Sequence, residues 1–395
     1  MNFITVSQAK DIVKSEIYQG SIVKKNLEEA LYHYTAEDIY APLDVPSFDN
    51  SAMDGYAFNY EQYKEKIPLK ISYTIQAGAT DLPILKKGEV ARIYTGAPIP
   101  KGADTVVMQE KIKENLGELQ IQDSKIFQGM NVRLKASQTK KGDLLVPKNT
   151  FINSGIVGFL AGFGFTQLPV YAFPKVGLIV TGNELVEAGK PLQQGQIYES
   201  NSQALKALLQ DINIQPHKIV KVLDDKDSTI ETIQDFWEEV DILIMTGGIS
   251  VGDYDFVKEA LEISGVEKLF YKIQQKPGKP IFFGKKKNKY VFALPGNPAS
   301  VLINFYQYVR PFLEGIQGNL NFNKSKRTAR LATAYKKENT LTLFLKAIYK
   351  QGKVCLLPTQ ESYKMDAFTK ANCLVELHGD PRLIEENEEV TLWKI

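Results

Sequence analysis

The chain has 395 residues, more than one hydrophobic core usually serves, so several domains are expected. Its hydrophobic fraction of 44% is ordinary for a globular protein, and its net charge of +2 supplies no basic field for nucleic acid. Two cysteines and three scattered histidines exclude a disulfide framework and argue against a zinc site. We find no signal peptide and no apolar run of membrane-spanning length, so we expect a cytoplasmic protein without membrane contacts.

The first half of the chain contains three successive sequence patterns. Residues 7–39 show the apolar spacing of helices. From 44 to about 147, short apolar runs are broken by Gly, Pro and Asp, which predicts a small β-rich domain. Residues 151–169 are apolar and glycine-rich, and they fit a short packing helix or a strand-bearing connector equally well.

From Pro174 onward, fully apolar runs alternate with helical stretches, which predicts a doubly wound, mostly parallel α/β domain. Ligands of such sheets bind at the carboxyl ends of the strands. Past residue 318 the short-strand pattern returns and predicts a small all-β terminal domain. The expected strands are 175–180, 217–223, 241–245, 268–273, 281–283 and 290–294, and the expected helices are 202–209, 228–239, 255–263 and 299–313.

The segment 46–58 contains two acidic residues, Asp49 and Asp54, together with the amide of Asn50 and the hydroxyl of Ser51, and apolar residues flank this group. Such density favours a loop, and a turn with an Asx cap would explain one of the acids. Oxygen-only ligands of this kind also suit Mg²⁺, which is usually held by one or two carboxylates plus substrate phosphate. Thr95-Gly96 offers a hydroxyl and open backbone at an expected strand end, although a tight turn explains it as well.

Thr181-Gly182-Asn183-Glu184 follows an expected buried strand, so Glu184 should lie at the carboxyl edge of the sheet. A charge there is costly unless it is paired, hydrated or bound to metal. A helix first-turn acid that complements the helix dipole is an equally good interpretation of Glu184.

Residues 246–255 combine a strand end, the glycine-rich run Thr246-Gly247-Gly248 and a helix start, which together make an anion site. The segment is neither a Walker A loop nor a dinucleotide fingerprint. Asp253 and Asp255 would repel a phosphate unless a cation lies between them, which again points to Mg²⁺.

Two proline-stiffened loops complete the set. Lys276 and Lys279 can fix an oxyanion, and the segment from Pro295 to Pro298 leads into a helix whose first turn holds Ser300. Free amides and the hydroxyl there could bind a second anion. A proline turn followed by a helix cap accounts for each piece separately.

These five segments, in this order, resemble the molybdopterin molybdenumtransferase family, the group of MoeA and the gephyrin E-domain. The strings are D-N-S-A-M-D-G-Y-A, T-G-A-P-I-P, T-G-N-E-L, T-G-G-I-S-V-G-D-Y-D and L-P-G-N-P-A-S. The resemblance spans nearly the whole chain. It implies a helical part of an elongated region at 1–45, a β-rich domain at 46–138, a return segment of the elongated region at 139–173, an α/β molybdopterin-binding domain at 174–318 and a C-terminal β-barrel-like domain at 319–395.

The resemblance implies that adenylyl-molybdopterin and molybdate are converted into molybdenum cofactor and AMP, with Mg²⁺ as cofactor. It implies a homodimer with shared active sites, in which Asp54 and Thr95 act on substrate held by the other subunit. Glu184 and Asp255 are the other catalytic residues that it implies, and both join Asp54 as Mg²⁺ ligands. Contacts with molybdopterin adenylyltransferase and with enzymes that receive the cofactor are also consistent with it. The implied substrate-binding residues are Thr181, Gly182, Asp224, Thr246, Gly247, Gly248, Ser250, Lys276, Lys279, Pro295, Pro298 and Ser300.

Three positions depart from the family pattern. Gln138 stands where an acid is usual, so no catalytic role is given to it. Lys346 stands where arginine is common. Lysine keeps the positive charge but lacks the planar guanidinium group that can bind an oxyanion with two hydrogen bonds. Asn183 for Asp is a milder change, and Ser362 matches a serine-containing loop of the family only loosely.

Two other functions remain open at this point. A non-catalytic scaffold or carrier that binds molybdopterin would explain Gln138, but it leaves the intact acids Asp54, Glu184 and Asp255 unexplained. A nucleotide-cleaving enzyme unrelated to molybdenum would use the same α/β domain, but it does not account for the match in the first and last domains.

Overall fold

The computed structural model describes residues 3–115, 118–249 and 256–395. The chain divides into two compact units. The large unit contains Met1–Ala36, Asn149–Asn153 and Gln167–Ile395, and the small unit contains Glu37–Lys148 and Ser154–Thr166.

The centre of the large unit is a six-stranded sheet with the strand order β16-β13-β17-β21-β20-β18. The first four strands in this order are parallel, and the last two are antiparallel to their neighbours. The predicted doubly wound, mostly parallel domain is confirmed. The strands are β13 (Val176–Thr181), β16 (Pro216–Val222), β17 (Ile242–Thr246), β18 (Glu267–Tyr271), β20 (Phe282–Lys286) and β21 (Lys289–Leu294).

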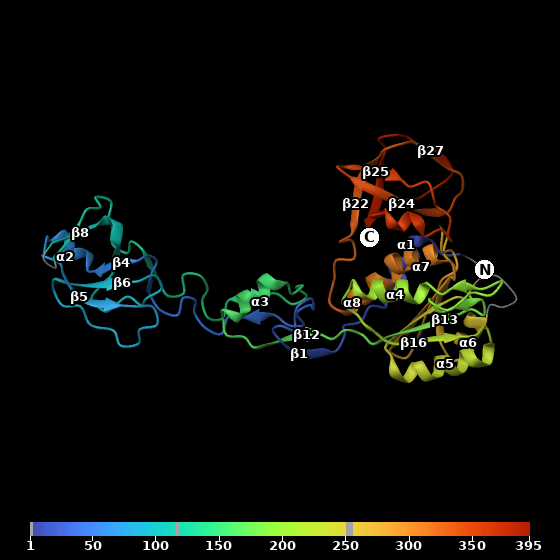
Figure 1. Cartoon of the computed structure of the whole chain (residues 1–395), viewed down its shortest axis with the longest axis horizontal. Helices are drawn as coiled ribbons and strands as arrows, with labels where there is room; N and C mark the ends of the chain where they lie inside the picture. Colours follow the sequence, from blue (N-terminus) through green and yellow to red (C-terminus); the bar gives the residue numbers. More distant parts are fainter. Residues whose placement is uncertain (1–2, 116–117, 250–255) are drawn as a thin grey trace. The chain divides into compact units, whose positions relative to one another are not determined.

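Helices cover both faces of this sheet, as Figure 1 shows. Alternate strand residues face opposite cores, so Leu178 and Ile244 pack in one core while Ile179 and Met245 pack in the other. One face is covered by α1 (Val6–Ser15), α4 (Asn201–Gln210), α7 (Pro298–Asn304), the π-helical turn η2 (Phe305–Val309) and α8 (Arg310–Ile316). The other is covered by α5 (Lys226–Glu239) and α6 (Phe256–Ile263).

The end of the chain forms a closed barrel, because the nine-residue strand β24 pairs with both β25 and β26. The barrel interior is filled by apolar side chains such as Leu345, Val375 and Leu392. The predicted β-barrel-like domain is confirmed. Its elements are β22 (Lys326–Leu331), β23 (Tyr335–Lys337), β24 (Thr342–Lys350), β25 (Lys353–Leu356), η3 (Asp366–Thr369), β26 (Cys373–Leu377), β27 (Arg382–Ile384) and β28 (Glu389–Lys394).

The prediction of helix throughout 7–39 is wrong beyond α1. The helix begins with a capping box at Thr5 and ends after Ser15. Gly20 then passes so close to α8 that an added Cβ would lie 3.0 Å from the Ile316 carbonyl oxygen. Residues Ile22–Asn26 form β1, which pairs antiparallel with β12 (Gln167–Tyr171). The β-branched residues Ile22 and Val23 favour a strand, and the partner of this strand is distant in sequence.

The small unit is built on a second six-stranded sheet, with the order β7-β4-β6-β5-β9-β8. Residues of one strand alternate between two apolar clusters, as Ala57 and Phe58 do. The predicted β-rich part of the fold is confirmed. Its elements are β2 (Ile39–Tyr40), β3 (Asn50–Ser51), β4 (Gly55–Phe58), α2 (Tyr60–Lys64), β5 (Lys70–Ile75), β6 (Glu89–Ile93), β7 (Thr105–Met108), η1 (Gln109–Lys111), β8 (Ile112–Asn115), β9 (Glu118–Ile121), β10 (Val132–Arg133), β11 (Leu144–Val146) and α3 (Ser154–Ala161).

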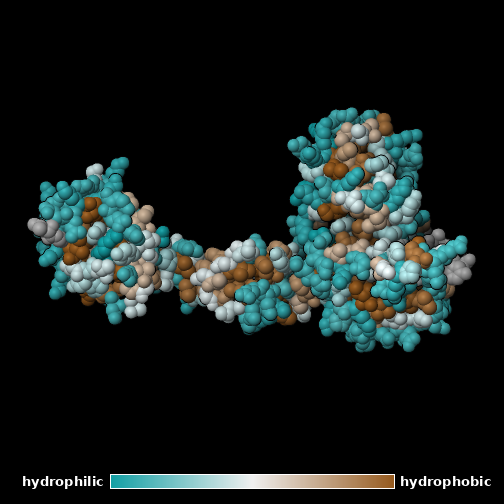
Figure 2. Space-filling model, in the orientation of Figure 1, coloured by the Kyte–Doolittle hydropathy of each residue, from teal (hydrophilic) through white to brown (hydrophobic). Residues whose placement is uncertain are grey.

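The glycine-rich stretch 151–169 contains both structures that its sequence allowed, α3 and the start of β12. Hydrophobic surface lies over α3 in Figure 2, and its Phe159 is 37% exposed. In the parts of the chain that the structure describes, no helix is both long and apolar enough to cross a bilayer.

Candidate functional site

A cavity of about 910 Å³ opens where the parallel strands of the large unit end. Its walls come from the loops after β13, β17 and β21, from the loop that follows β18, and from residues 360–363 of the barrel domain. This is the edge at which doubly wound sheets bind ligands. The predicted residues that line it are Thr181, Gly182, Glu184, Asp224, Gly247, Gly248, Lys276, Lys279, Pro295, Pro298 and Ser300.

Three other predicted site residues that the structure describes, Thr246, Asp54 and Thr95, do not line this cavity. Thr246 is fully buried at the end of β17, where its hydroxyl oxygen has no partner among the described residues. Ser250 and Asp255 fall outside the described residues. Asp54 and Thr95 belong to the small unit.

Glycine is required where the ends of β13 and β17 approach each other. Gly247 has a φ of +90°, and a Cβ added there would lie 2.4 Å from the Thr181 carbonyl oxygen. No side chain could replace this hydrogen without moving the strand ends apart. The glycine-rich run thus leaves the main chain at the floor of the cavity uncovered by side chains.

Two carboxylates at this edge are available to a cation. Asp224 accepts a hydrogen bond from the Asn183 amide at 3.2 Å and donates its own amide to the Asn183 side-chain oxygen at 3.0 Å. Glu184 is exposed and accepts no side-chain hydrogen bond within the described residues. One or two carboxylates beside space for phosphate and water form a donor set that fits Mg²⁺. Considering only the described residues, no group of three or more His, Cys, Asp or Glu side chains is placed to hold a metal without substrate.

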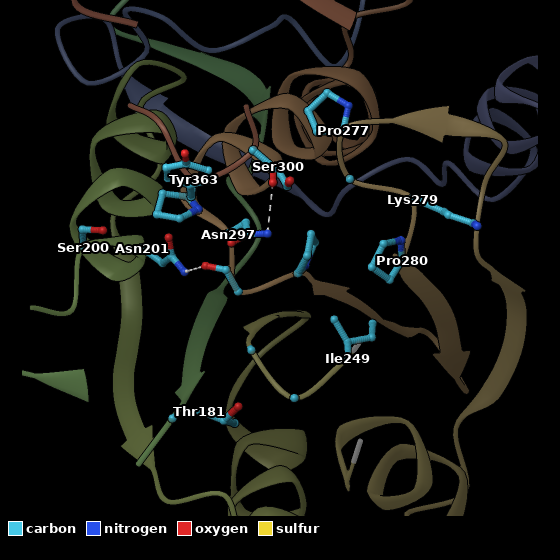
Figure 3. Close-up of a pocket in the computed structure, with 18 of the residues that line it drawn as sticks. Thr181, Ser200, Asn201, Ile249, Pro277, Lys279, Pro280, Asn297, Ser300 and Tyr363 are labelled. Carbon is cyan, nitrogen blue, oxygen red and sulfur yellow. Dashed lines mark hydrogen bonds between the residues drawn. The ribbon is translucent and has the colours of Figure 1, made fainter. Parts of the chain in front are cut away.

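The two predicted oxyanion lysines, Lys276 and Lys279, lie on one chain segment beside the cavity. Lys276 ends β19 (Gln275–Lys276), and Lys279 lies on the loop that follows this strand. The Lys279 side chain points away from Ser300 and Asn297 in Figure 3, and its Nζ lies 4.4 Å from the centre of the Phe3 ring. A substrate anion would have to compete with this cation–π contact for Lys279.

The start of α7 is organised differently from our expectation of free amides. The Ala299 amide donates to the Ser362 carbonyl oxygen at 3.1 Å, and the Ser300 amide donates to the Asn297 oxygen at 3.0 Å. The Asn297 side chain also donates to the Ser362 hydroxyl at 3.1 Å (Figure 3). The Ala299 amide is occupied because the barrel domain supplies Ser362, which the sequence match had placed only loosely, and the Ser300 amide is occupied by the local turn at Asn297. The side chains at this wall are therefore better anion donors than its main chain.

Asn201 is a cavity residue that the sequence analysis missed. Its side-chain nitrogen donates to the Gly296 carbonyl oxygen at 2.8 Å, and its oxygen is buried without a partner among the described residues (Figure 3). An asparagine at a helix start usually signals a cap, which hides such a role.

Lys346 lies behind the cavity rather than in its wall. The side chain is fully buried on β24, and Nζ donates to the carbonyl oxygens of Glu361 at 3.2 Å and Lys364 at 3.1 Å. Burial lowers the pKa of Lys346, and the nearby acids Asp366 and Glu361 oppose that shift. Lys346 thus holds the loop that carries Ser362.

In the small unit, Asp54 and Thr95 form a close pair, as expected for one site. One oxygen of Asp54 accepts from the Thr95 hydroxyl at 2.7 Å and from the Thr95 amide at 2.7 Å. Both bonds stabilise the charged form, and with nearby Arg92 they hold the pKa of Asp54 below its usual value. A Cβ added at Gly55 would lie 1.9 Å from the Val107 carbonyl oxygen, so the residue after the acid must be glycine.

Asp49, by contrast, has a local structural partner. One of its carboxylate oxygens accepts from the Lys135 amide at 2.6 Å. Gln138 is exposed in the small unit, where its amide donates to the Val45 carbonyl oxygen at 3.0 Å.

Comparison with known proteins agrees with this architecture. Family models match the MoeA N-terminal region (domain I and II) over 4–164, a probable molybdopterin binding domain over 177–315 and the MoeA C-terminal region (domain IV) over 328–395. The molybdopterin molybdenumtransferase of Haemophilus influenzae is 35% identical over 396 residues, which cover 98% of each chain. That of Staphylococcus aureus strain Mu50 is 32% identical over 390 residues, which cover 96% of this chain and 93% of that protein.

Solved structures give the same result. A crystal structure of the molybdopterin biosynthesis MoeA protein from Pyrococcus horikosii has a TM-score of 0.87 and 30% identity, covering 100% of this chain and 99% of that one. The mostly parallel sheet, its edge cavity and the terminal barrel thus define a MoeA-type enzyme. The chain belongs to the molybdopterin molybdenumtransferase family, and it is a transferase of molybdenum cofactor biosynthesis.

Proposed function

We propose that this enzyme inserts molybdenum from molybdate into adenylyl-molybdopterin and releases AMP. In this reaction an oxygen of molybdate or of water attacks the adenylyl phosphorus, the phosphoanhydride bond breaks, and AMP leaves with that oxygen. The dithiolene sulfurs of the pterin then bind molybdenum in place of molybdate oxygens, which are released as water without a change in oxidation state. The observation that carries the proposal is the edge cavity, which joins the glycine-rich floor at Gly247, the acids Glu184 and Asp224, and the lysine-bearing loop at 276–279.

Each wall has chemistry suited to one part of the substrates. The main chain at Gly247 and Gly248 can be approached closely by a phosphate or a pterin edge. Lys276 and Ser300 offer an ammonium and a hydroxyl to molybdate. Apolar side chains at Leu185 in β14 (Leu185–Val186) and Ile197 in β15 (Ile197–Tyr198) line another wall and suit a planar ring.

Glu184 and Asp224 are the described residues that would hold Mg²⁺, and Asp255 remains an expected ligand. The ion would neutralise charge that develops on the phosphates when the anhydride is cleaved. Asp54, held ionised by Thr95, would orient the attacking oxygen. We place it opposite the cavity of a partner subunit in a homodimer, on the family resemblance.

Asparagine at position 54 tests this role without removing the loop contacts. Asp54→Asn keeps an oxygen that can accept both bonds from Thr95 but loses the charge. We expect AMP release to fall by at least about 100-fold, the scale of a lost acid–base or metal-directing group. Adenylyl-molybdopterin turnover followed by chromatography of AMP measures this.

Asp49→Asn is the matched control, since it changes a carboxylate of the same loop that caps the Lys135 amide. This variant should release AMP at close to the unmodified rate. Equal rates for the two asparagine variants would remove Asp54 from the active site.

A further inference from the structure

A buried polar triad lies behind the lysine-bearing loop of the cavity. It consists of Gln275 in β19, Asn304 at the end of α7 and Tyr308 in η2, and each of these side chains is fully buried. Large apolar residues such as Ile303 and Phe305 surround it in the core. Buried polar groups are costly in such surroundings unless every partner is in place.

The triad is satisfied by the loop itself. The Gln275 nitrogen donates to the carbonyl oxygens of Pro277 and Gly278, both at 3.1 Å, and to the Asn304 oxygen at 2.7 Å. The Asn304 nitrogen donates to the same Gly278 oxygen at 3.2 Å. The Tyr308 hydroxyl donates to the Gln275 oxygen at 2.5 Å and fixes the orientation of its amide.

The loop packs so closely against the triad that there is no room for a side chain at Gly278. Gly278 has a φ of +80°, and a Cβ there would lie 2.8 Å from the Asn304 side-chain nitrogen. The main chain between Lys276 and Lys279 is therefore fixed by hydrogen bonds from the triad to two consecutive carbonyl oxygens, those of Pro277 and Gly278. The π-helical turn that carries Tyr308 is a distortion often retained at functional sites.

We propose that Gln275, Asn304 and Tyr308 are positioning residues that fix the Lys276–Lys279 loop for oxyanion binding. The inference rests on the proposed function of the same cavity. Asn304 and Tyr308 do not line the cavity. Gln275 does line it, but its side chain is fully buried and its amide nitrogen donates to the carbonyl oxygens of Pro277 and Gly278, so the three residues act through the main chain of the loop. Loss of one bond frees the loop to sample other conformations, and the lysines then bind molybdate less tightly.

Tyr308→Phe removes only the hydroxyl that orients the Gln275 amide. With saturating adenylyl-molybdopterin, we expect the KM for molybdate to rise about tenfold, the effect of one hydrogen bond. The kcat and the KM for adenylyl-molybdopterin should stay within about twofold, because the other walls of the cavity are untouched.

Tyr290→Phe is the matched control. Tyr290 lies on β21, is buried and donates its hydroxyl to Glu16 at 3.1 Å. It should leave the KM for molybdate unchanged although it also removes one hydrogen bond. Equal increases in both phenylalanine variants, or no increase with Tyr308→Phe, would overturn the proposal.

Gln275→Glu adds a test that a merely structural role would not pass. An ionised carboxylate would face the carbonyl oxygens of Pro277 and Gly278 without a proton to donate, whereas its protonated form donates one. Because burial raises the pKa of a carboxyl group, the KM for molybdate should fall toward the unmodified value between about pH 8 and about pH 6. The unmodified enzyme and Tyr308→Phe should show no such decrease in the KM for molybdate on acidification. If Gln275→Glu also shows no decrease, the proposal is contradicted.

Lys276→Ala separates this inference from the function it rests on. If Lys276→Ala leaves the KM for molybdate unchanged, the oxyanion assignment of the loop fails and the triad loses its role. If Lys276→Ala raises that KM while Tyr308→Phe does not, the cavity assignment stands and the positioning role alone is refuted.

Discussion

At the scale of single residues, the pair Asp54 and Thr95 shows how a carboxylate is prepared in an open loop. Asp54 is only partly buried, and its charged form is stabilised by two hydrogen bonds to one oxygen, which outweigh the effect of desolvation on its pKa. The second oxygen remains available to a substrate or a cation. Gly55 allows this because its missing side chain lets β4 pass against the Val107 carbonyl.

Thr95→Val tests this account with almost no change in side-chain shape. A bond to the ionised form lowers a pKa, so losing the hydroxyl bond raises the pKa of Asp54 toward its usual value. On acidification, the carboxylate then loses its charge at a higher pH than in the unmodified protein. NMR titration of the Asp54 carboxyl carbon measures this shift.

Thr95→Ser is its control, since it keeps a hydroxyl at the same place. The Asp54 pKa should remain low in that variant. The same titration curve for valine and serine would mean that the hydroxyl bond does not set the pKa.

At the scale of elements, Lys346 connects the barrel to the cavity. It ties β24 to the loop 361–364, whose Ser362 in turn contacts the start of α7. At the position where the family resemblance led us to expect arginine, this chain has a lysine whose three donors suit two carbonyl oxygens. In this structure its ammonium is directed at main-chain acceptors.

Lys346→Met should loosen that loop and weaken the wall formed by Ser362 and Ser300. We expect the KM for molybdate to rise roughly tenfold, the consequence of losing one or two charge-assisted bonds. Lys337→Met is a close control, because Lys337 is also a buried barrel lysine that donates to two carbonyl oxygens, of Asn339 and Gly379. An equal change in KM for both methionine variants would show that only barrel stability matters.

The sequence was sufficient to predict features that depend on strand direction. Thr181, Gly247 and Pro295 follow parallel strands, whose carboxyl ends meet at one edge, and the structure places them in one cavity. Features that depend on distant partners were not accessible. The strand β1 was predicted as helix because its partner β12 lies far along the chain. The roles of Gln275 and Lys346 follow from burial, which has no local sequence pattern.

At the scale of the whole molecule, the proposed catalytic groups belong to two compact units. Asp54 and Thr95 lie in the small unit, and the cavity lies in the large unit. A homodimer with shared sites would combine the small unit of one subunit with the large unit of its partner. The exposed apolar surface of α3 is a further reason to expect a partner.

Mixed dimers test whether the active site is shared. Asp54→Asn and Glu184→Gln chains, each inactive alone, would be co-expressed with different tags and the mixed species isolated. A shared site leaves one of the two sites of a mixed dimer intact, so about half of the unmodified activity per dimer should return. No recovery in a mixed dimer of proven composition would place both residues in the site of a single subunit.

AMP release from adenylyl-molybdopterin with Mg²⁺, measured with and without molybdate, tests molybdenum insertion most directly. We expect AMP to appear when molybdate is present, together with an equal amount of molybdenum-loaded pterin. Release of AMP at the same rate without molybdate would contradict molybdenum insertion and favour a simple nucleotide-cleaving enzyme. No release under either condition would favour a carrier that only binds the pterin.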